Sequence, residues 1–191
     1  MATRWLVAGL GNPGPEYSRT RHNVGFRVAD DLARRLGARF KRSKHSAQVA
    51  DARDGDAQLI LAKPQTFMND SGRALAALAR YYDVPLDHVI VVHDELDLPF
   101  GAVRVKLGGG TAGHNGVNDV ARAIGPGFVR VRVGIGRPSG RKDPIDFVLE
   151  LYGKREEAEV PATVDLAADA VLTVVREGVS SAQTIFNKRT E

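Results

Sequence analysis

Four consecutive apolar residues, Val89-Ile90-Val91-Val92, constrain the fold more than any other stretch of the chain. All four are β-branched, which favours a strand. A run without polar interruptions is typical of a strand that is buried on both faces of its sheet. A strand of that kind needs helices on both sides. A second apolar run at residues 5–8 predicts another short buried strand, so an α/β sandwich is expected.

The rest of the chain alternates between strand and helix patterns. Turn residues at 54–56 predict a hairpin, which would make the sheet mixed. We expect residues 1–191 to form a single domain, a sandwich with a mixed β-sheet flanked by helices. Residues 144–149 predict a short strand or turn, and Pro161 is expected to open a long helix that Gly178 ends. Further strands are expected at 58–62, 103–107 and 129–135, and further helices over 24–36, 75–82, 117–124 and from Ser181.

Composition excludes several classes of protein. The chain has no cysteine, which rules out disulfides and thiolate metal sites and is compatible with a cytoplasmic location. No apolar stretch approaches the roughly 20 residues of a membrane span. The net charge is only +4, but between residues 101 and 142 Asp119 is the only acid. The same stretch holds a set of basic residues that favours a phosphate or nucleic-acid partner: Arg104, Lys106, Arg122, Arg130, Arg132, Arg137, Arg141 and Lys142.

The loop after the first strand contains the pattern G-x-G-x-x-G at Gly9, Gly11 and Gly14. The same pattern occurs in dinucleotide-binding proteins, so a nucleotide-dependent oxidoreductase is one alternative. In those proteins the helix starts inside the glycine run and meets the pyrophosphate. Here Pro13 and Pro15 interrupt the run, and the helical stripe starts only near Val24. The loop is therefore expected to serve another kind of site.

Polar side chains gather in four loops that each leave a predicted strand or precede a helix. In an open α/β sheet such loops can converge on one crevice. We expect a single site built from these residues: Asn12, Tyr17, His22, Asn23, Met68, Asn69, His93, Asp94, Asp97, His114 and Asn115.

The residue types of this site suit hydrolysis by an activated water molecule. An imidazole is well matched to general-base work near neutral pH. A buried aspartate can fix its tautomer, and carboxamides can stabilise an oxyanion. Other interpretations stay open, since Asp94 could cap a turn, Asn115 could serve a turn beside glycine, and Met68 could belong to the core. A metal site would need a ligand spacing such as H-x-x-x-H, which is absent, so no metal or cofactor is expected.

Four sequence motifs carry a resemblance to a known family. Residues 9–14 (Gly-Leu-Gly-Asn-Pro-Gly), with Tyr17 and residues 20–23 (Thr-Arg-His-Asn), resemble the first signature of bacterial peptidyl-tRNA hydrolases. Residues 63–72, 93–97 and 108–116 resemble the other three, in the family's order. The resemblance implies a single α/β domain with a twisted mixed sheet. It also implies an enzyme that cleaves the ester between a peptide and the 3′-ribose of tRNA without a metal or cofactor.

The resemblance also implies roles for single residues. His22 would be the general base, Asp94 would orient it, and Asn12, Asn69 and Asn115 would position substrate or oxyanion. Substrate contacts would come from Tyr17, Asn23, Phe67, Met68 and His114. Lys106 and Arg132 would contact tRNA phosphates, and both fall on the basic faces of alternating strands.

The implied partner is peptidyl-tRNA, bound through its acceptor stem and 3′-CCA end by a monomeric cytoplasmic protein with no membrane contact. The chain has Asn118 where the family usually carries a basic residue, so we expect weaker tRNA contact there. A non-catalytic RNA-binding relative of the same fold is a second hypothesis. The presence of His22, Asp94, Asn12 and Asn69 together favours the enzyme.

Overall fold

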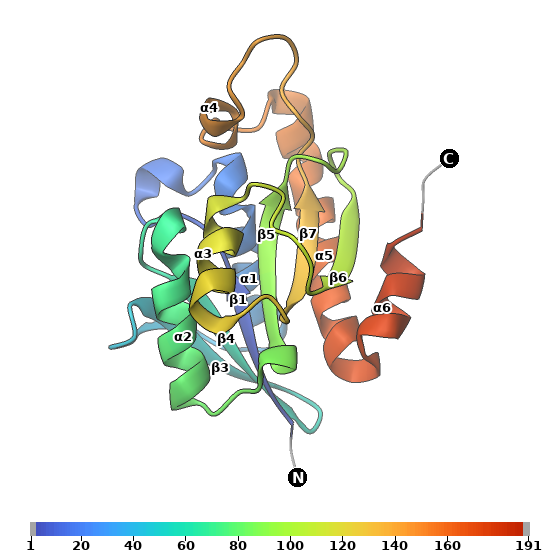
Figure 1. Ribbon diagram of the computed structural model, residues 1–191. Helices are drawn as coiled ribbons and strands as arrows, with labels where there is room; N and C mark the ends of the chain where they lie inside the picture. Colours follow the sequence, from blue (N-terminus) through green and yellow to red (C-terminus); the bar gives the residue numbers. More distant parts are fainter. Residues whose placement is uncertain (1–2, 189–191) are drawn as a thin grey trace.

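The computed structural model describes residues 3–188, so the ends of the predicted 1–191 domain lie outside the described residues. One seven-stranded sheet runs through the molecule in the order β2-β3-β4-β1-β5-β7-β6, with helices on both faces (Figure 1). Its strands are β1 (Arg4–Gly9), β2 (Lys41–Arg42), β3 (Ala47–Asp54), β4 (Ala57–Pro64), β5 (Val89–Glu95), β6 (Val103–Leu107) and β7 (Val129–Gly134). The sheet is mixed as predicted, because β4, β1, β5 and β7 are parallel while β2, β3 and β6 pair antiparallel.

Two helical layers cover the sheet. The helices α1 (Val24–Arg35), α5 (Lys154–Glu177) and α6 (Val179–Phe186) pack on one face. The helices α2 (Ser71–Tyr81) and α3 (Asn115–Ile124) pack on the other. The prediction for residues 89–92 is confirmed, since Ile90 and Val92 join the first core and Val89 and Val91 join the second. Among the described residues, no helix has the length and apolar character needed to cross a bilayer.

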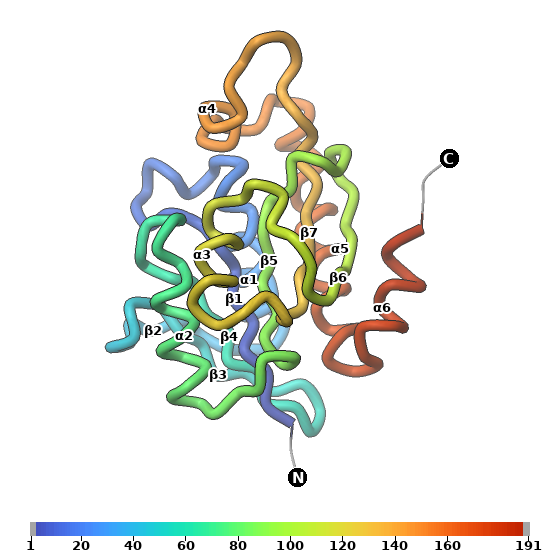
Figure 2. Tube along the Cα trace, in the orientation of Figure 1, coloured from blue at the N-terminus to red at the C-terminus, as the bar shows by residue number. Residues whose placement is uncertain are grey.

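The two edges of the sheet are covered by different elements (Figure 2). At one end the short strand β2 pairs with the start of β3, and the hairpin predicted at residues 54–56 joins β3 to β4. At the other end α6 lies beside the edge strand β6. There the side-chain amide of Asn187 accepts from the N–H of Val105 at 2.7 Å and donates to its carbonyl at 2.8 Å. The amide thus occupies backbone groups that an edge strand would otherwise leave open.

Three sequence predictions need correction. Residues 144–149 do not form a strand or a simple turn, because α4 (Pro144–Val148) is a short helix. The side chain of Asp143 accepts from the N–H of Ile145 at 2.9 Å, and proline at the first helical position completes a favourable start. Pro161 does not open α5 but lies inside it. Because Pro161 is exposed, solvent can satisfy the carbonyl that loses its helical partner.

The third correction concerns β5, which was expected to end at residue 92. The strand continues to Glu95, so Asp94 belongs to a rigid strand and not to a loop. The carboxyl ends of β4, β1, β5 and β7 lie at the same edge of the sheet because these strands are parallel. The segments that leave them, together with α4 above, surround one region of that edge (Figure 1). This is the usual location of a site in an open α/β sheet.

Candidate active site

The glycines of the first loop let backbone segments approach closely. A Cβ on Gly9 would lie 2.0 Å from the carbonyl oxygen of Gly25 at the start of α1. A Cβ on Gly25 would in turn lie 2.5 Å from the carbonyl oxygen of Val92. The start of α1 therefore packs directly against the ends of β1 and β5. The helix begins only at Val24, after two 3-10 turns, η1 (Pro15–Tyr17) and η2 (Arg21–Asn23). The predicted mismatch with a dinucleotide loop is therefore present in the structure.

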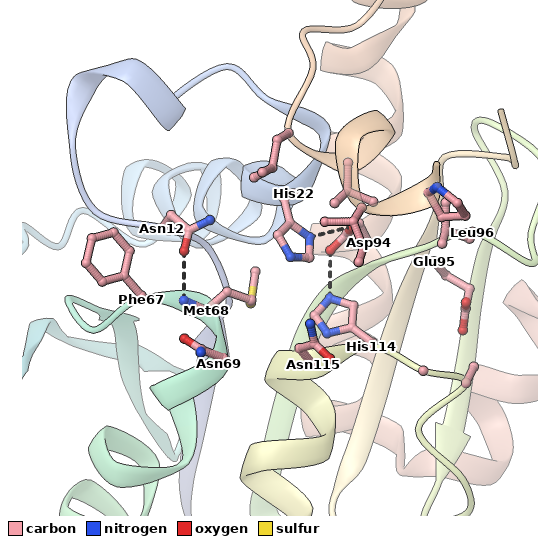
Figure 3. A pocket seen from close by; sticks show the side chains of 16 residues that line it. Asn12, His22, Phe67, Met68, Asn69, Asp94, Glu95, Leu96, His114 and Asn115 are labelled. Atoms are coloured by element: carbon pink, nitrogen blue, oxygen red, sulfur yellow. Dashed lines mark hydrogen bonds and ion pairs between the residues drawn. The ribbon is translucent and has the colours of Figure 1, made fainter. Parts of the chain in front are cut away.

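A groove of about 500 Å³ lies at the carboxyl edge of the sheet. Three of the four predicted loops meet there, and the strand end of β5 supplies the remaining part. The groove is lined by eight of the predicted residues, namely Asn12, His22, Phe67, Met68, Asn69, Asp94, His114 and Asn115 (Figure 3). The four segments meet at one crevice as predicted, but four of the residues expected there do not line it, namely Tyr17, Asn23, His93 and Asp97.

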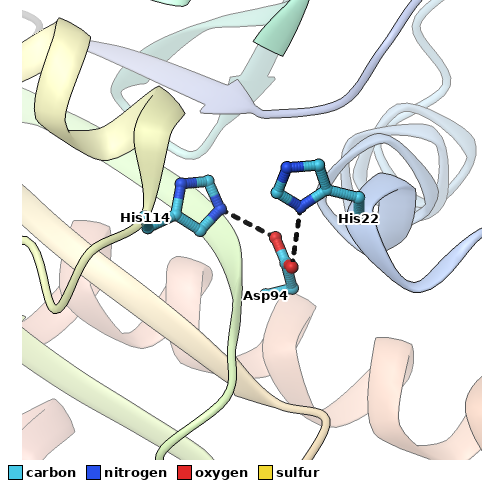
Figure 4. A group of neighbouring side chains, drawn as sticks. All are labelled: His22, Asp94 and His114. Atoms are coloured by element: carbon cyan, nitrogen blue, oxygen red, sulfur yellow. Dashed lines mark hydrogen bonds and ion pairs between the residues drawn. The ribbon is translucent and has the colours of Figure 1, made fainter. Parts of the chain in front are cut away.

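Asp94 joins two imidazoles at the floor of this groove (Figure 4). Its Oδ2 lies 2.8 Å from Nδ1 of His22, and its Oδ1 lies 2.8 Å from Nε2 of His114. The Nδ1 of His114 accepts from the backbone N–H of Val117, as the N-cap of α3. His114 therefore carries its proton on Nε2 and donates it to Asp94. His22 donates from Nδ1 to the other carboxylate oxygen, which leaves its Nε2 lone pair facing the groove.

Burial and charge have opposite effects on the pKa values of Asp94 and His22. Burial alone would raise the pKa of the Asp94 carboxyl, but the interactions with His22 and His114 outweigh it and hold this pKa well below its usual range. Burial would lower the pKa of His22, but the charge and hydrogen bond of Asp94 outweigh burial there and raise it above 6.5. His22 is thus a stronger base than a free imidazole, oriented by an ionised carboxylate.

Asn12 is fixed by two neighbours. Its Oδ1 accepts from the backbone N–H of Met68 at 2.7 Å, so its Nδ2 is left as a donor toward the groove. The buried side chain of Asn23 accepts from the Asn12 N–H and donates to the Asn12 carbonyl, both at 2.9 Å. Gly116 allows α3 to pack on this assembly, since a Cβ there would lie 2.5 Å from the Met68 sulfur.

Two predicted substrate contacts lie outside the groove lining. Tyr17 ends the turn η1, and Asn23 supports Asn12 from below. Their contact with substrate stays a prediction. Conversely, sequence reasoning missed the apolar wall opposite Phe67, which is formed by Pro144, Ile145, Val148 and Leu149. The one sequence signal for this wall was a pair of large aliphatic residues, Ile145 and Leu149, in a segment to which no role had been assigned.

A smaller cavity of about 220 Å³ lies beside the groove, on the sheet face that α2 and α3 leave uncovered. Lys106, Arg130 and Arg132 line it together with His93 and Glu95. Two of these three basic side chains already have partners within the protein. Arg130 is buried and donates to the carbonyls of Gly110 and Pro126, and Arg132 donates twice to Glu95 Oε1, at 2.9 and 3.0 Å. Burial lowers the pKa of His93 to about 3, so this imidazole is neutral.

A metal ion could be considered at the two imidazoles and Asp94, whose ligand atoms lie within 4.8 Å of one another. The hydrogen bonds of His114 argue against it. Its Nε2 would have to lose the proton that it donates to Asp94, and its Nδ1 would then need a proton where it now accepts from Val117. The donor set therefore fits a hydrogen-bonded group better than a metal site.

Comparison with known proteins identifies the family. The family model for peptidyl-tRNA hydrolase matches residues 6–191. The chain belongs to the peptidyl-tRNA hydrolase family. It is 57% identical over 180 residues to the peptidyl-tRNA hydrolase of Nocardia farcinica, with 93% of each chain covered. It is 50% identical over 190 residues to that of an Arthrobacter strain, with 98% of each covered.

A solved structure supports both the family and the fold. The crystal structure of peptidyl-tRNA hydrolase from Acinetobacter baumannii is 34% identical to this chain and has a TM-score of 0.92, covering 100% of this chain and 97% of that one. The predicted fold class and the family resemblance are therefore confirmed. The plant 5′-methylthioadenosine nucleosidase from Arabidopsis thaliana, at 10% identity and a TM-score of 0.56, shares the fold only.

Proposed function

We propose that this protein hydrolyses the ester bond of peptidyl-tRNA with His22 as the general base. Family membership makes it a peptidyl-tRNA hydrolase, and the comparisons give no support to the non-catalytic RNA-binding alternative. The observation that carries the residue assignment is the bridging of two imidazoles by Asp94, which leaves Nε2 of His22 as the free basic nitrogen in the groove.

The reaction runs in two steps at this nitrogen. A water molecule gives a proton to Nε2 of His22 while its oxygen bonds to the ester carbonyl carbon, forming a tetrahedral oxyanion. The bond to the ribose oxygen then breaks, and that oxygen takes the proton back from the imidazolium. The products are a tRNA with a free 3′-terminal ribose and a peptide with a free carboxylic acid, which ionises by releasing its proton to solvent. Asp94 stabilises the imidazolium between the steps.

Carboxamides supply the donors for the oxyanion. Asn12 is the best placed, because its Oδ1 is held by Met68 and its Nδ2 is left to donate. Asn69 and Asn115 are exposed and line the groove, where they can hold the peptide backbone or the tRNA end (Figure 3). Phe67 and the apolar wall opposite it would contact the peptide side chains.

The tRNA would extend from the groove toward the basic cavity beside it. Lys106 and Arg132 line that cavity and would contact phosphates of the acceptor stem, with the 3′-CCA end leading to His22. Asn118 is exposed on α3, and we expect it to contribute less to tRNA binding than a basic residue would. We further infer that the protein is monomeric and forms a single domain. We also infer that it acts in the cytoplasm, where its substrate requires it.

A single-turnover assay tests the proposal. The release of a labelled peptide from N-acetyl-aminoacyl-tRNA is measured for the wild type and for His22→Ala, together with tRNA binding by filter retention. The wild type should cleave, and His22→Ala should bind tRNA normally while losing most of the rate, by about 10³-fold or more. Near-normal cleavage by His22→Ala would contradict the general-base assignment.

A further inference from the structure

The residue next to the catalytic histidine has an unusual environment. The Arg21 side chain is only 8% exposed although it is charged. Its guanidinium carbon lies 3.8 Å from the ring centre of Phe147, and its Nη1 donates to the Phe147 carbonyl at 3.2 Å. Its Nη2 pairs with Glu156 at 3.2 Å, and Glu150 lies 3.6 Å from Nη1. No step of the hydrolysis uses this side chain.

Arg21 holds the segment that forms the apolar wall of the groove. Its backbone N–H donates to the Glu150 carbonyl at 3.0 Å, and Thr20 forms a β-bridge with Leu151. The helix α4 contacts the turn η2, which contains Arg21, more than any other element. Figure 1 shows α4 and the preceding loop standing above the sheet edge, outside the two helical layers.

A helix as short as α4 depends on such contacts for its position. Five residues form little more than one turn, which has no stability of its own in water. The groove side of α4 carries Ile145 and, just after it, Leu149, which are 64% and 42% exposed, so the helix gains little from packing on that side. Phe147, between the core and Arg21, is the residue through which the arginine can fix the helix.

We propose that Arg21 is a positioning residue that fixes α4 as the peptide-binding wall and thereby sets affinity for apolar peptide residues. This inference rests on the proposed use of the groove for the peptide. A planar guanidinium can stack on the ring and at the same time donate to a carbonyl and a carboxylate, which an ammonium group cannot do. Without it, α4 occupies its docked position in only a fraction of molecules, and the apparent affinity for peptide falls by that fraction.

The effect should depend on the peptide and not on the ester. Two substrates separate these cases, N-acetyl-Gly-tRNA and N-acetyl-Leu-Leu-Gly-tRNA, which share the same tRNA and the same scissile bond. For Arg21→Ala we expect KM to rise roughly tenfold for the longer substrate and by less than about twofold for the shorter one. The kcat for both should stay within about threefold of the wild type, because the bond between His22 and Asp94 is unchanged.

Two more variants make the result decisive. Arg19→Ala is the matched control, since Arg19 is an exposed arginine of the same segment whose one ion-pair partner within residues 3–188 is Glu157, and it should leave both KM values unchanged. Phe147→Leu removes the ring but keeps both glutamates, and it should raise KM for the longer substrate in the same direction. If thermal unfolding shows that Arg21→Ala does not fold, the KM values of Phe147→Leu test the positioning role instead.

The outcomes also separate this inference from the proposed function. Equal KM increases for the two substrates, or a loss confined to kcat, would overturn the positioning role of Arg21 while the hydrolase stands. A wild type that cleaves neither substrate would contradict the hydrolase itself.

Discussion

Replacing Asp94 by asparagine tests the central interaction of the site. The two oxygens of the carboxylate accept one N–H from His22 and one from His114. An asparagine side chain has only one oxygen, and its NH₂ group would face a donor on the other side. The His114 tautomer is fixed by Val117, so the conflict falls on His22. His22 would move its proton to Nε2, which removes the base.

The expected loss follows from the charge that is removed. The Nδ1 of His22 and the Oδ2 of Asp94 are 2.8 Å apart, so the centres of the two charges are about 4 Å apart when the imidazolium forms. At an effective dielectric constant of about 20, that interaction is on the order of 4 kcal/mol. This corresponds to about 10³-fold in rate. The change of tautomer adds to it, so we expect single-turnover cleavage to fall by about 10³- to 10⁴-fold.

The pH profile gives a second readout. The carboxylate raises the pKa of His22 above 6.5, so the wild-type rate should increase with pH and level off only above that value. In Asp94→Asn the residual activity should level off at lower pH, because burial still lowers the pKa of His22 and the raising interactions are gone. Asp97→Asn is the control, since Asp97 is a more exposed carboxylate that pairs with Arg137. A rate for Asp94→Asn within about tenfold of the wild type would refute the reasoning.

Three further predictions concern other parts of the molecule. Lys106→Ala and Arg132→Ala should each weaken tRNA binding and reduce the slope of log affinity against log salt by roughly one, whereas Arg53→Ala at the opposite edge of the sheet should not. Prolonged dialysis against EDTA should leave the cleavage rate unchanged, and a loss restored by added zinc would instead indicate a metal at the imidazoles. Asn187→Ala should lower the free energy of unfolding by about 1–2 kcal/mol in urea denaturation, since two hydrogen bonds to Val105 are lost.

Much of the fold follows from local patterns in the sequence. The run at residues 89–92 and the alternation at 103–107 and 129–135 predict strands because side-chain direction repeats every two residues. The hairpin at 54–56 and the end of α5 at Gly178 follow from turn and cap chemistry. Pro161 misled the prediction because proline normally occupies the first turn of a helix, whereas here it lies inside α5 on an exposed face, where solvent can satisfy the carbonyl that loses its partner.

The site was only partly visible in the sequence. The four motifs identified the residues that gather at the groove, and parallel strands made their convergence expected. Whether Asp94 would serve a turn, one imidazole or two could not be decided from spacing, since His22 and His114 lie far from it in the chain. The burial of Arg21 and Arg130 gave no signal in the sequence, because a buried arginine cannot be told from a surface one until its neighbours are known.

The sequence alone determined the class of fold, the family and most of the polar side chains that gather at the groove, because these depend on local periodicity and on motifs that are continuous in the chain. The tertiary structure alone decided which nitrogen of His22 is free, which tautomer His114 adopts and which apolar wall lines the groove. Those properties depend on hydrogen bonds and contacts between segments that are distant in the chain, and they exist only once the chain has folded.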